Sequence, residues 1–105
     1  MAWVYLIAAG LFEVGWPVGL KWAQDPRKLI IGAVMAIGCL IVSGVLLYFA
    51  QKEVAIGTAY AVWTGIGAAG TFLLGVWVFG DPGSAGRYLG VALVIAGVLT
   101  LRLAH

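Results

Sequence analysis

The chain has 105 residues, of which 64% are hydrophobic and only 10% are charged, and its formal net charge is +2. This apolar content and a mean hydropathy of +1.10 exclude an ordinary soluble domain. The sequence lacks the glycine loop and following Lys that cradle nucleotide phosphates, and its six Lys and Arg residues are scattered, so neither ATP hydrolysis nor a nucleic-acid surface is expected.

Four long apolar stretches predict four membrane-spanning helices. A spanning helix needs roughly 20 largely apolar residues to cross about 30 Å of hydrocarbon. Short polar turns at 24–28, 51–53 and 80–84 separate the stretches. We therefore expect a single all-α integral membrane domain over residues 1–105, multi-pass in the plasma (inner) membrane, with helices at about 2–21, 29–50, 56–79 and 86–103.

The positive charges of the loops give only a weak signal for orientation. Lys and Arg residues in short loops normally decide which side of a membrane protein faces the cytoplasm. One face carries Lys21, Arg27, Lys28 and Arg87, and the other carries Lys52, Arg102 and the α-amino group. With so small a bias, we expect that the chain can insert both ways up.

Glu13 is the one charged residue that lies neither in a turn nor near the end of a predicted helix. A charged side chain at the bilayer centre costs at least about 2.5 kcal/mol, and ionisable residues in spanning segments are functional by default. Burial without a partner favours the protonated form of a carboxyl group. Glu13 must therefore hold a proton, pair with a cation or alternate between the two, and this alternation is proton-coupled cation exchange. The alternative is a protonated glutamate that acts only as a structural hydrogen-bonding group.

The sequence around Glu13 predicts a polar and aromatic cavity. Trp16 follows Glu13 by three positions and therefore shares its helix face. Pro17 has no N–H to donate to the Glu13 carbonyl, so we expect a bend in the helix beside the acid. Ser43 is the only serine of the second predicted helix and lies near its middle.

The third predicted helix carries a polar and aromatic stripe formed by Tyr60, Trp63 and Thr64. Tyr60 and Trp63 also lie about one turn inside the helix, so anchoring at the membrane interface is an alternative role for them. A carboxylate between such rings suits a planar organic cation, because it accepts parallel N–H bonds from a guanidinium group and the ring faces attract positive charge. Gly65 and Gly67 follow in a stretch poor in side chains, where we expect the hinge that alternating access requires.

Most of the sixteen glycines lie inside the predicted helices. Small residues let helix backbones approach closely in a bilayer, where the hydrophobic effect does not drive helices together. Gly90 and Gly97 are seven positions apart and share one face of the fourth predicted helix. We expect this face to pack against another helix, between subunits.

Residues 10–16 (GLFEVGW), residues 57–67 (GTAYAVWTGIG) and the spacing of Gly90 and Gly97 resemble the small multidrug resistance family, over essentially the whole chain. Trp16 and the tripeptide WTG at 63–65 resemble the guanidinium-exporter branch, because the quaternary-ammonium branch usually carries Thr near position 16. The resemblance implies a proton-coupled antiporter, rather than an enzyme, that exports guanidinium or substituted guanidines by alternating access. It implies no cofactor or metal, with the proton as the coupling ion.

The resemblance also implies an antiparallel, dual-topology dimer of two oppositely inserted copies, or a pair with a paralogous subunit. Glu13 from both subunits would be shared by protons and substrate in one central site. The residues lining that site by position would be Trp16, Ser43, Tyr60 and Trp63. In such a dimer Ser43 would hydrogen-bond the glutamate, Tyr60 would act in binding and gating, and Gly90 and Gly97 would pack the fourth helix against its partner.

Two positions depart from the family pattern, and other functions stay open at this point. Pro17 stands where a small residue such as Ala is expected, and Arg102 where the guanidinium branch tends to have Lys. We expect Pro17 to reshape the pocket, so a larger guanidine derivative such as guanylurea is also an expected substrate. The alternatives are a broad quaternary-ammonium exporter, a small dual-topology ion channel and a membrane subunit that transports nothing.

Overall fold

The structure, a computed structural model, describes residues 1–104 and consists of four long helices. They are α1 (Ala2–Ala23), α2 (Leu29–Ala50), α3 (Ile56–Trp77) and α4 (Ala85–Ala104), and a short 3-10 helix, η1 (Pro26–Lys28), precedes α2. Each long helix has the length and apolar character needed to cross a membrane. A helix of 22 residues rises about 33 Å, which matches the roughly 30 Å of bilayer hydrocarbon. The expectation of an all-α chain with four spanning helices is therefore confirmed.

The helix ends differ slightly from those expected from the sequence. α1 continues to Ala23 rather than ending at Lys21, and it runs through Pro17 without interruption. α3 ends at Trp77, two residues earlier than expected, because the chain begins there to turn back toward α4. Gly80 adopts a φ of +75° in this turn, a conformation that side-chain-bearing residues rarely take.

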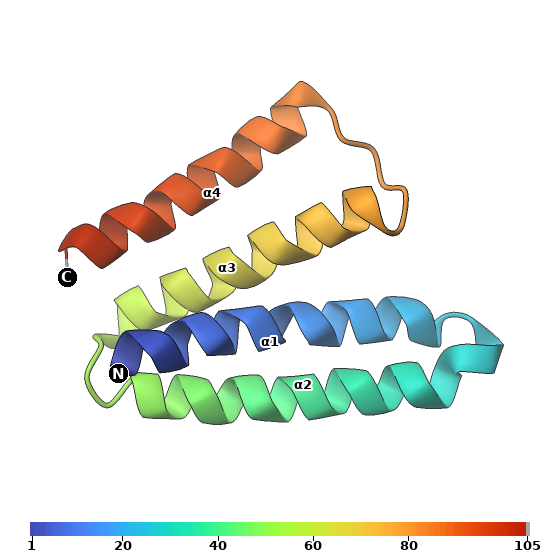
Figure 1. The fold of residues 1–105 in the computed structure, drawn as a ribbon, viewed down its shortest axis with the longest axis horizontal. Coiled ribbons are helices and arrows are strands. Elements are labelled where there is room, and N and C mark those ends of the chain that lie inside the picture. The colour runs from blue at the N-terminus through green and yellow to red at the C-terminus, as the bar shows by residue number, and fades with distance from the viewer. Residues whose placement is uncertain (105) are drawn as a thin grey trace.

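The first three helices lie side by side, and α4 diverges from them (Figure 1). α2 runs antiparallel to α1, whereas α3 runs in the same direction as α1, so the N-terminal halves of α1 and α3 lie at the same end of the molecule. The overall dimensions are 44 × 34 × 16 Å. The shortest of these is less than half of either of the other two. A single copy is therefore a flat layer rather than a closed bundle.

Glycine brings α1 and α2 into backbone contact. A Cβ atom added at Gly19 would lie 2.6 Å from the carbonyl oxygen of Gly32, and one added at Gly32 would lie 2.6 Å from the backbone nitrogen of Ala23. No side chain fits at either position without separating the helices. Close packing of small residues thus holds this pair together, as is usual in bilayers.

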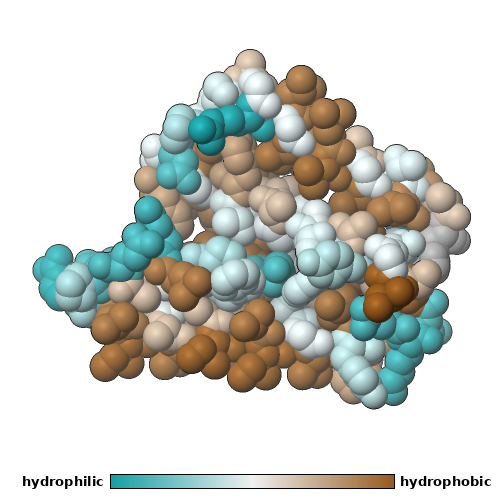
Figure 2. All heavy atoms as spheres, turned by 180° about the vertical axis from the view of Figure 1, so that it is seen from behind, coloured by the Kyte–Doolittle hydropathy of each residue, from teal (hydrophilic) through white to brown (hydrophobic). Residues whose placement is uncertain are grey.

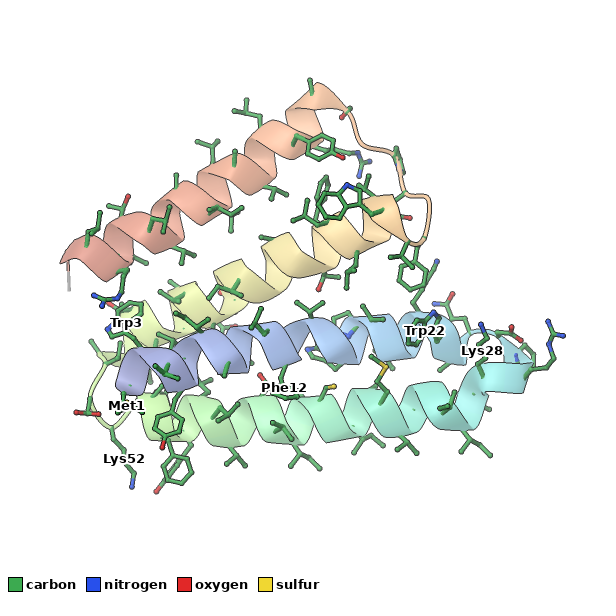
Figure 3. All side chains as sticks on the ribbon, in the orientation of Figure 1. Met1, Trp3, Phe12, Trp22, Lys28 and Lys52 are labelled. Atoms are coloured by element: carbon green, nitrogen blue, oxygen red, sulfur yellow. The ribbon has the colours of Figure 1, made fainter. Side chains whose placement is uncertain are left out.

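The edge of the layer formed by α2 is apolar, and the most polar residues lie at the helix ends. Hydrophobic atoms cover the edge formed by α2, while hydrophilic atoms lie at the turns (Figure 2). Lys52 and Met1 mark one end of the helices, and Lys28 and Trp22 mark the other (Figure 3). This distribution suits a chain whose middle is surrounded by hydrocarbon and whose ends meet the headgroups.

α4 is the least covered element. None of its residues is buried, and within residues 1–104 its backbone approaches only that of α3. Near its C-terminal end, the Arg102 guanidinium lies 4.9 Å from the centre of the Trp3 ring. This cation–π contact at the membrane boundary fits an anchoring role for both side chains.

Candidate functional site

Glu13 lies in the middle of the membrane-spanning part of α1. It is eleven positions after Ala2 and ten before Ala23, so about 15 Å of helix separates it from either end. Its side chain is half-buried and faces α3 at Gly67. A Cβ atom added at Gly67 would overlap the Glu13 Cγ and lie 3.1 Å from its Cβ. The missing side chain at Gly67 therefore provides the space that Glu13 occupies.

Trp16 is the direct hydrogen-bond partner of Glu13. Its indole Nε1–H donates to Oε1 of Glu13 over 2.7 Å. The two residues are one turn apart on the same face of α1, as the sequence spacing predicts. A carboxylate has about four acceptor positions, so this bond leaves most of the acceptor capacity of Glu13 for a proton or a ligand.

Ser43 is fully buried and is engaged by two other residues rather than by Glu13. Its hydroxyl donates to the carbonyl oxygen of Ala9 over 2.7 Å and accepts the indole N–H of Trp63, also over 2.7 Å. A serine hydroxyl has a single hydrogen to donate. The bond from Ser43 to the glutamate that the family resemblance implies is therefore not made in this conformation, because Ala9, one turn before Glu13, takes that hydrogen.

The aromatic residues of α3 form a second group next to Glu13. The ring of Tyr60 lies 5.6 Å from that of Trp63, and Tyr60 is 57% exposed. Trp63 is four positions and Tyr60 seven positions before Gly67, and α1 and α3 run in the same direction, so the two residues lie about 6 Å and about 10 Å along the helices from the glutamate. The structure thus joins Glu13 to Trp16, and Ser43 to Trp63, whose ring lies beside that of Tyr60.

A groove of about 440 Å³ opens beside Glu13 between α1 and α3. Its lining residues are Glu13, Pro17, Thr64, Gly67, Ala68, Thr71, Phe72 and Asp81. Thr64 belongs to the polar and aromatic stripe predicted for this helix, whereas Ala68, Thr71, Phe72 and Asp81 were not predicted to line the site. Thr71 follows Thr64 by seven positions, which places their two hydroxyl groups on one face of α3, and this spacing is a signal in the sequence that could have indicated Thr71.

The glycines predicted to act as hinge or dimer contacts have different surroundings. Gly65 is buried against α4, where an added Cβ would lie 2.6 Å from Cγ2 of Val98. Gly67 packs on Glu13 as described above. Gly90 and Gly97 have no atom within 4 Å of an added Cβ, so their face of α4 is open in the single copy. The hinge and the dimer contact remain predictions.

Comparison with known proteins gives one consistent result. The family model described as Small Multidrug Resistance protein matches residues 1–94. A protein named guanidinium exporter from Yersinia pseudotuberculosis is 43% identical over 104 residues, which cover 99% of each chain. A protein of the same name from Proteus vulgaris is 42% identical over 99% of each chain. Another from Salmonella typhimurium is 41% identical over 98% of this chain and 97% of the relative.

The match therefore spans all four helices and includes the segment that carries Glu13 and Trp16. Four candidate membrane spans in the structure agree with a multi-pass membrane protein. The similarity to each relative extends over nearly the full length of both proteins, so it concerns the whole chain. This chain belongs to the small multidrug resistance family of membrane transporters.

Proposed function

We propose that this protein is a proton-coupled exporter of guanidinium and of small cations that carry a guanidinium group. In this proposal two oppositely inserted copies share one central site, and Glu13 binds protons and substrate in turn. The relatives named guanidinium exporter, which align over nearly their whole length, support the substrate class.

The observation that carries the proposal is a mid-membrane carboxyl group that forms no ion pair with a Lys or Arg side chain among residues 1–104. Within residues 1–104 the one ion pair joins Arg27 to Asp25, at 3.7 Å, in the exposed turn after α1. Glu13 has the neutral Trp16 indole as its hydrogen-bond partner. A charge so placed is stable only when a proton or a mobile cation neutralises it.

The donor geometry favours guanidinium over a quaternary ammonium ion. A planar guanidinium carries N–H donors that match the two oxygens of a carboxylate, and such charge-assisted bonds are about twice as strong as neutral ones. A tetraalkyl ammonium has no N–H to donate and would leave the acceptor positions of Glu13 unsatisfied. The groove of about 440 Å³ beside Glu13 falls in the range of small-molecule sites and has room for a substituted guanidine.

Exchange follows from the fact that one carboxylate cannot hold a proton and a cation at once. Protonated Glu13 is neutral, and the ion pair of ionised Glu13 with guanidinium is neutral as well. Either state is far less costly in hydrocarbon than the bare charge. Alternation between them, with the site opening to one side and then to the other, exports the cation against entering protons.

The open face of α4 supports the dimer. A spanning helix with no buried residue and two glycines without neighbours, Gly90 and Gly97, is suited to close packing against a second copy. The weak charge bias of the loops permits the second copy to be inserted the other way up. The partner would then bring its own glutamate toward the exposed Tyr60 and close the groove.

The proposal is tested by substituting Glu13→Gln, which keeps the shape of the side chain and removes its charge. In proteoliposomes the variant should lose guanidinium uptake and the accompanying proton flux together, because neither ion has a carboxylate to bind. Glu53→Gln, at an exposed glutamate in the turn between α2 and α3, is the matched control and should retain both. Proton-coupled exchange that persists in Glu13→Gln, or flux that needs no exchanged ion, would contradict the proposal.

Substrate class is tested on the unmodified protein. Guanidinium, guanylurea and a tetraalkyl ammonium ion are compared as competitors for uptake of labelled guanidinium. We expect the two guanidine compounds to compete and the tetraalkyl ion to compete weakly. Equal competition by the tetraalkyl ion would favour the broad-specificity exporter instead.

A further inference from the structure

The groove beside Glu13 continues to the end of the membrane-spanning layer. A second cavity of about 170 Å³ shares Pro17, Thr71 and Asp81 with the groove and reaches Lys21. The two cavities therefore form one path from the middle of the membrane to the face that carries the α1–α2 and α3–α4 turns. Asp81 lies where they meet.

The fold holds Asp81 against the last turns of α3. Its backbone N–H donates to the carbonyl of Gly75 over 2.9 Å, and a Cβ added at Gly75 would lie 2.5 Å from Oδ2 of Asp81. The positive φ of Gly80 lets the chain turn back over the helix end at this point. The carboxylate is thereby placed beside the C-terminal end of α3, whose free carbonyl groups also carry negative partial charge. Both features attract a cation.

The other groups on the path favour a cation near Asp81, on the side of the larger groove and away from Lys21. Thr71 adds a hydroxyl that lines both cavities. Among residues 1–104 no Lys or Arg forms an ion pair with Asp81. Lys21 lines only the smaller cavity, and its positive charge makes that cavity the less favourable one for a cation.

Asp81 is too far from Glu13 for one small cation to bind both. Glu13 packs on Gly67 and Asp81 on Gly75, eight positions later on the same helix, which corresponds to about 12 Å. That distance exceeds both the reach of salt bridges and the Debye length of about 8 Å at physiological ionic strength. A cation on this path would therefore occupy two separate positions.

We propose that Asp81 and Thr71 form an outer binding site, which holds a guanidinium-class cation on its way between the membrane surface and Glu13. The inference rests on the proposed function, which names the cation. In an antiparallel dimer the two copies present Asp81 at opposite membrane faces, so the outer site would serve both directions of exchange.

The test measures guanidinium exchange in proteoliposomes for Asp81→Asn, with Asp25→Asn as the matched control. Asp25 is an acid in the other turn on the same face, and its carboxylate caps η1 and pairs with Arg27 outside both cavities. Loss of the outer site lowers the local concentration of substrate, so the KM of Asp81→Asn should rise about threefold to tenfold with little change in kcat. Asp25→Asn should have the same KM for guanidinium as the unmodified protein. Asp81→Glu, which keeps the negative charge, should have a KM close to that of the unmodified protein.

Two further measurements keep the inference refutable if Asp81→Asn folds poorly. Thr71→Val leaves the turn intact and should also raise KM. High ionic strength should shrink the difference between the unmodified protein and the Asp81 variant, because salt screens an exposed charge. The outer site is refuted if Asp81→Asn and Thr71→Val have the same KM as Asp25→Asn while the unmodified protein exchanges guanidinium. Absence of guanidinium exchange by the unmodified protein would instead overturn the proposed function.

Discussion

Replacing Gly67 with alanine adds a single methyl group at the point where α3 meets Glu13. The new Cβ would overlap the Cγ of Glu13 and crowd its Cβ at 3.1 Å. Two responses can relieve the overlap. Either α1 and α3 move apart, or the Glu13 side chain leaves its present position.

Both responses have a cost that can be estimated. Overpacking of a well-packed contact destabilises by about 1–3 kcal/mol, which the better helix propensity of alanine offsets by about 1 kcal/mol. Rotation of Glu13 breaks the 2.7 Å bond from Trp16, and hydrogen bonds to charged groups contribute about 1.5–3 kcal/mol. The helices can therefore stay folded while the site is disturbed. Since about 1.4 kcal/mol corresponds to a factor of ten, we expect kcat/KM for guanidinium to fall by about tenfold to a hundredfold.

The assay is initial-rate exchange in proteoliposomes, with helix content and thermal unfolding in detergent measured on the same preparations. Gly44→Ala is the matched control, because Gly44 lies inside α2 with no neighbouring atom within 4 Å of an added Cβ. It should leave kcat/KM and unfolding nearly unchanged. If Gly67→Ala transports as well as Gly44→Ala, the space at Gly67 is not what positions the glutamate, and the packing argument is wrong.

Two further predictions concern stability and assembly. Ser43→Ala should lower the free energy of unfolding by about 1 kcal/mol, because the half-buried Trp63 indole N–H loses its acceptor. Thr100→Ala, whose hydroxyl bonds only within its own helix, is the control for thermal unfolding in detergent, and equal losses in the two variants would contradict this reasoning. Gly97→Leu should reduce energy transfer between labelled copies in liposomes, because Gly97 has no neighbour within its own copy and any contact that the leucine disturbs belongs to a second copy. Gly38→Leu, at an equally open position on α2, is the control and should leave energy transfer unchanged, and full dimerisation of Gly97→Leu would place the dimer contact elsewhere.

The sequence by itself determined the membrane class, the four spans and the depth of Glu13. These properties follow from composition and from position along the chain, because a charged residue in the middle of an apolar stretch must lie deep in the bilayer whatever the helices pack against. Local spacing also sufficed for the pair Glu13 and Trp16, which are neighbours on a helix face in any fold.

The contacts between residues of different helices could not be predicted in the same way. Helices in a bilayer are apolar on nearly all sides, so the hydrophobic pattern does not tell which face meets protein and which meets lipid. Glycines that pack closely, such as Gly67 and Gly19, look the same in the sequence as Gly44 or Gly90, which have no neighbours in the single copy.

Only the tertiary structure decided that α1 and α3 run side by side in the same direction, with Gly67 against Glu13. The same arrangement gives the Ser43 hydrogen to Ala9 and brings Asp81, from a turn sixty-eight positions later in the chain, to the groove that begins at Glu13. The physical reason is that contacts between helices depend on their relative placement, and van der Waals fit among small residues, rather than a polarity pattern, sets that placement in a membrane.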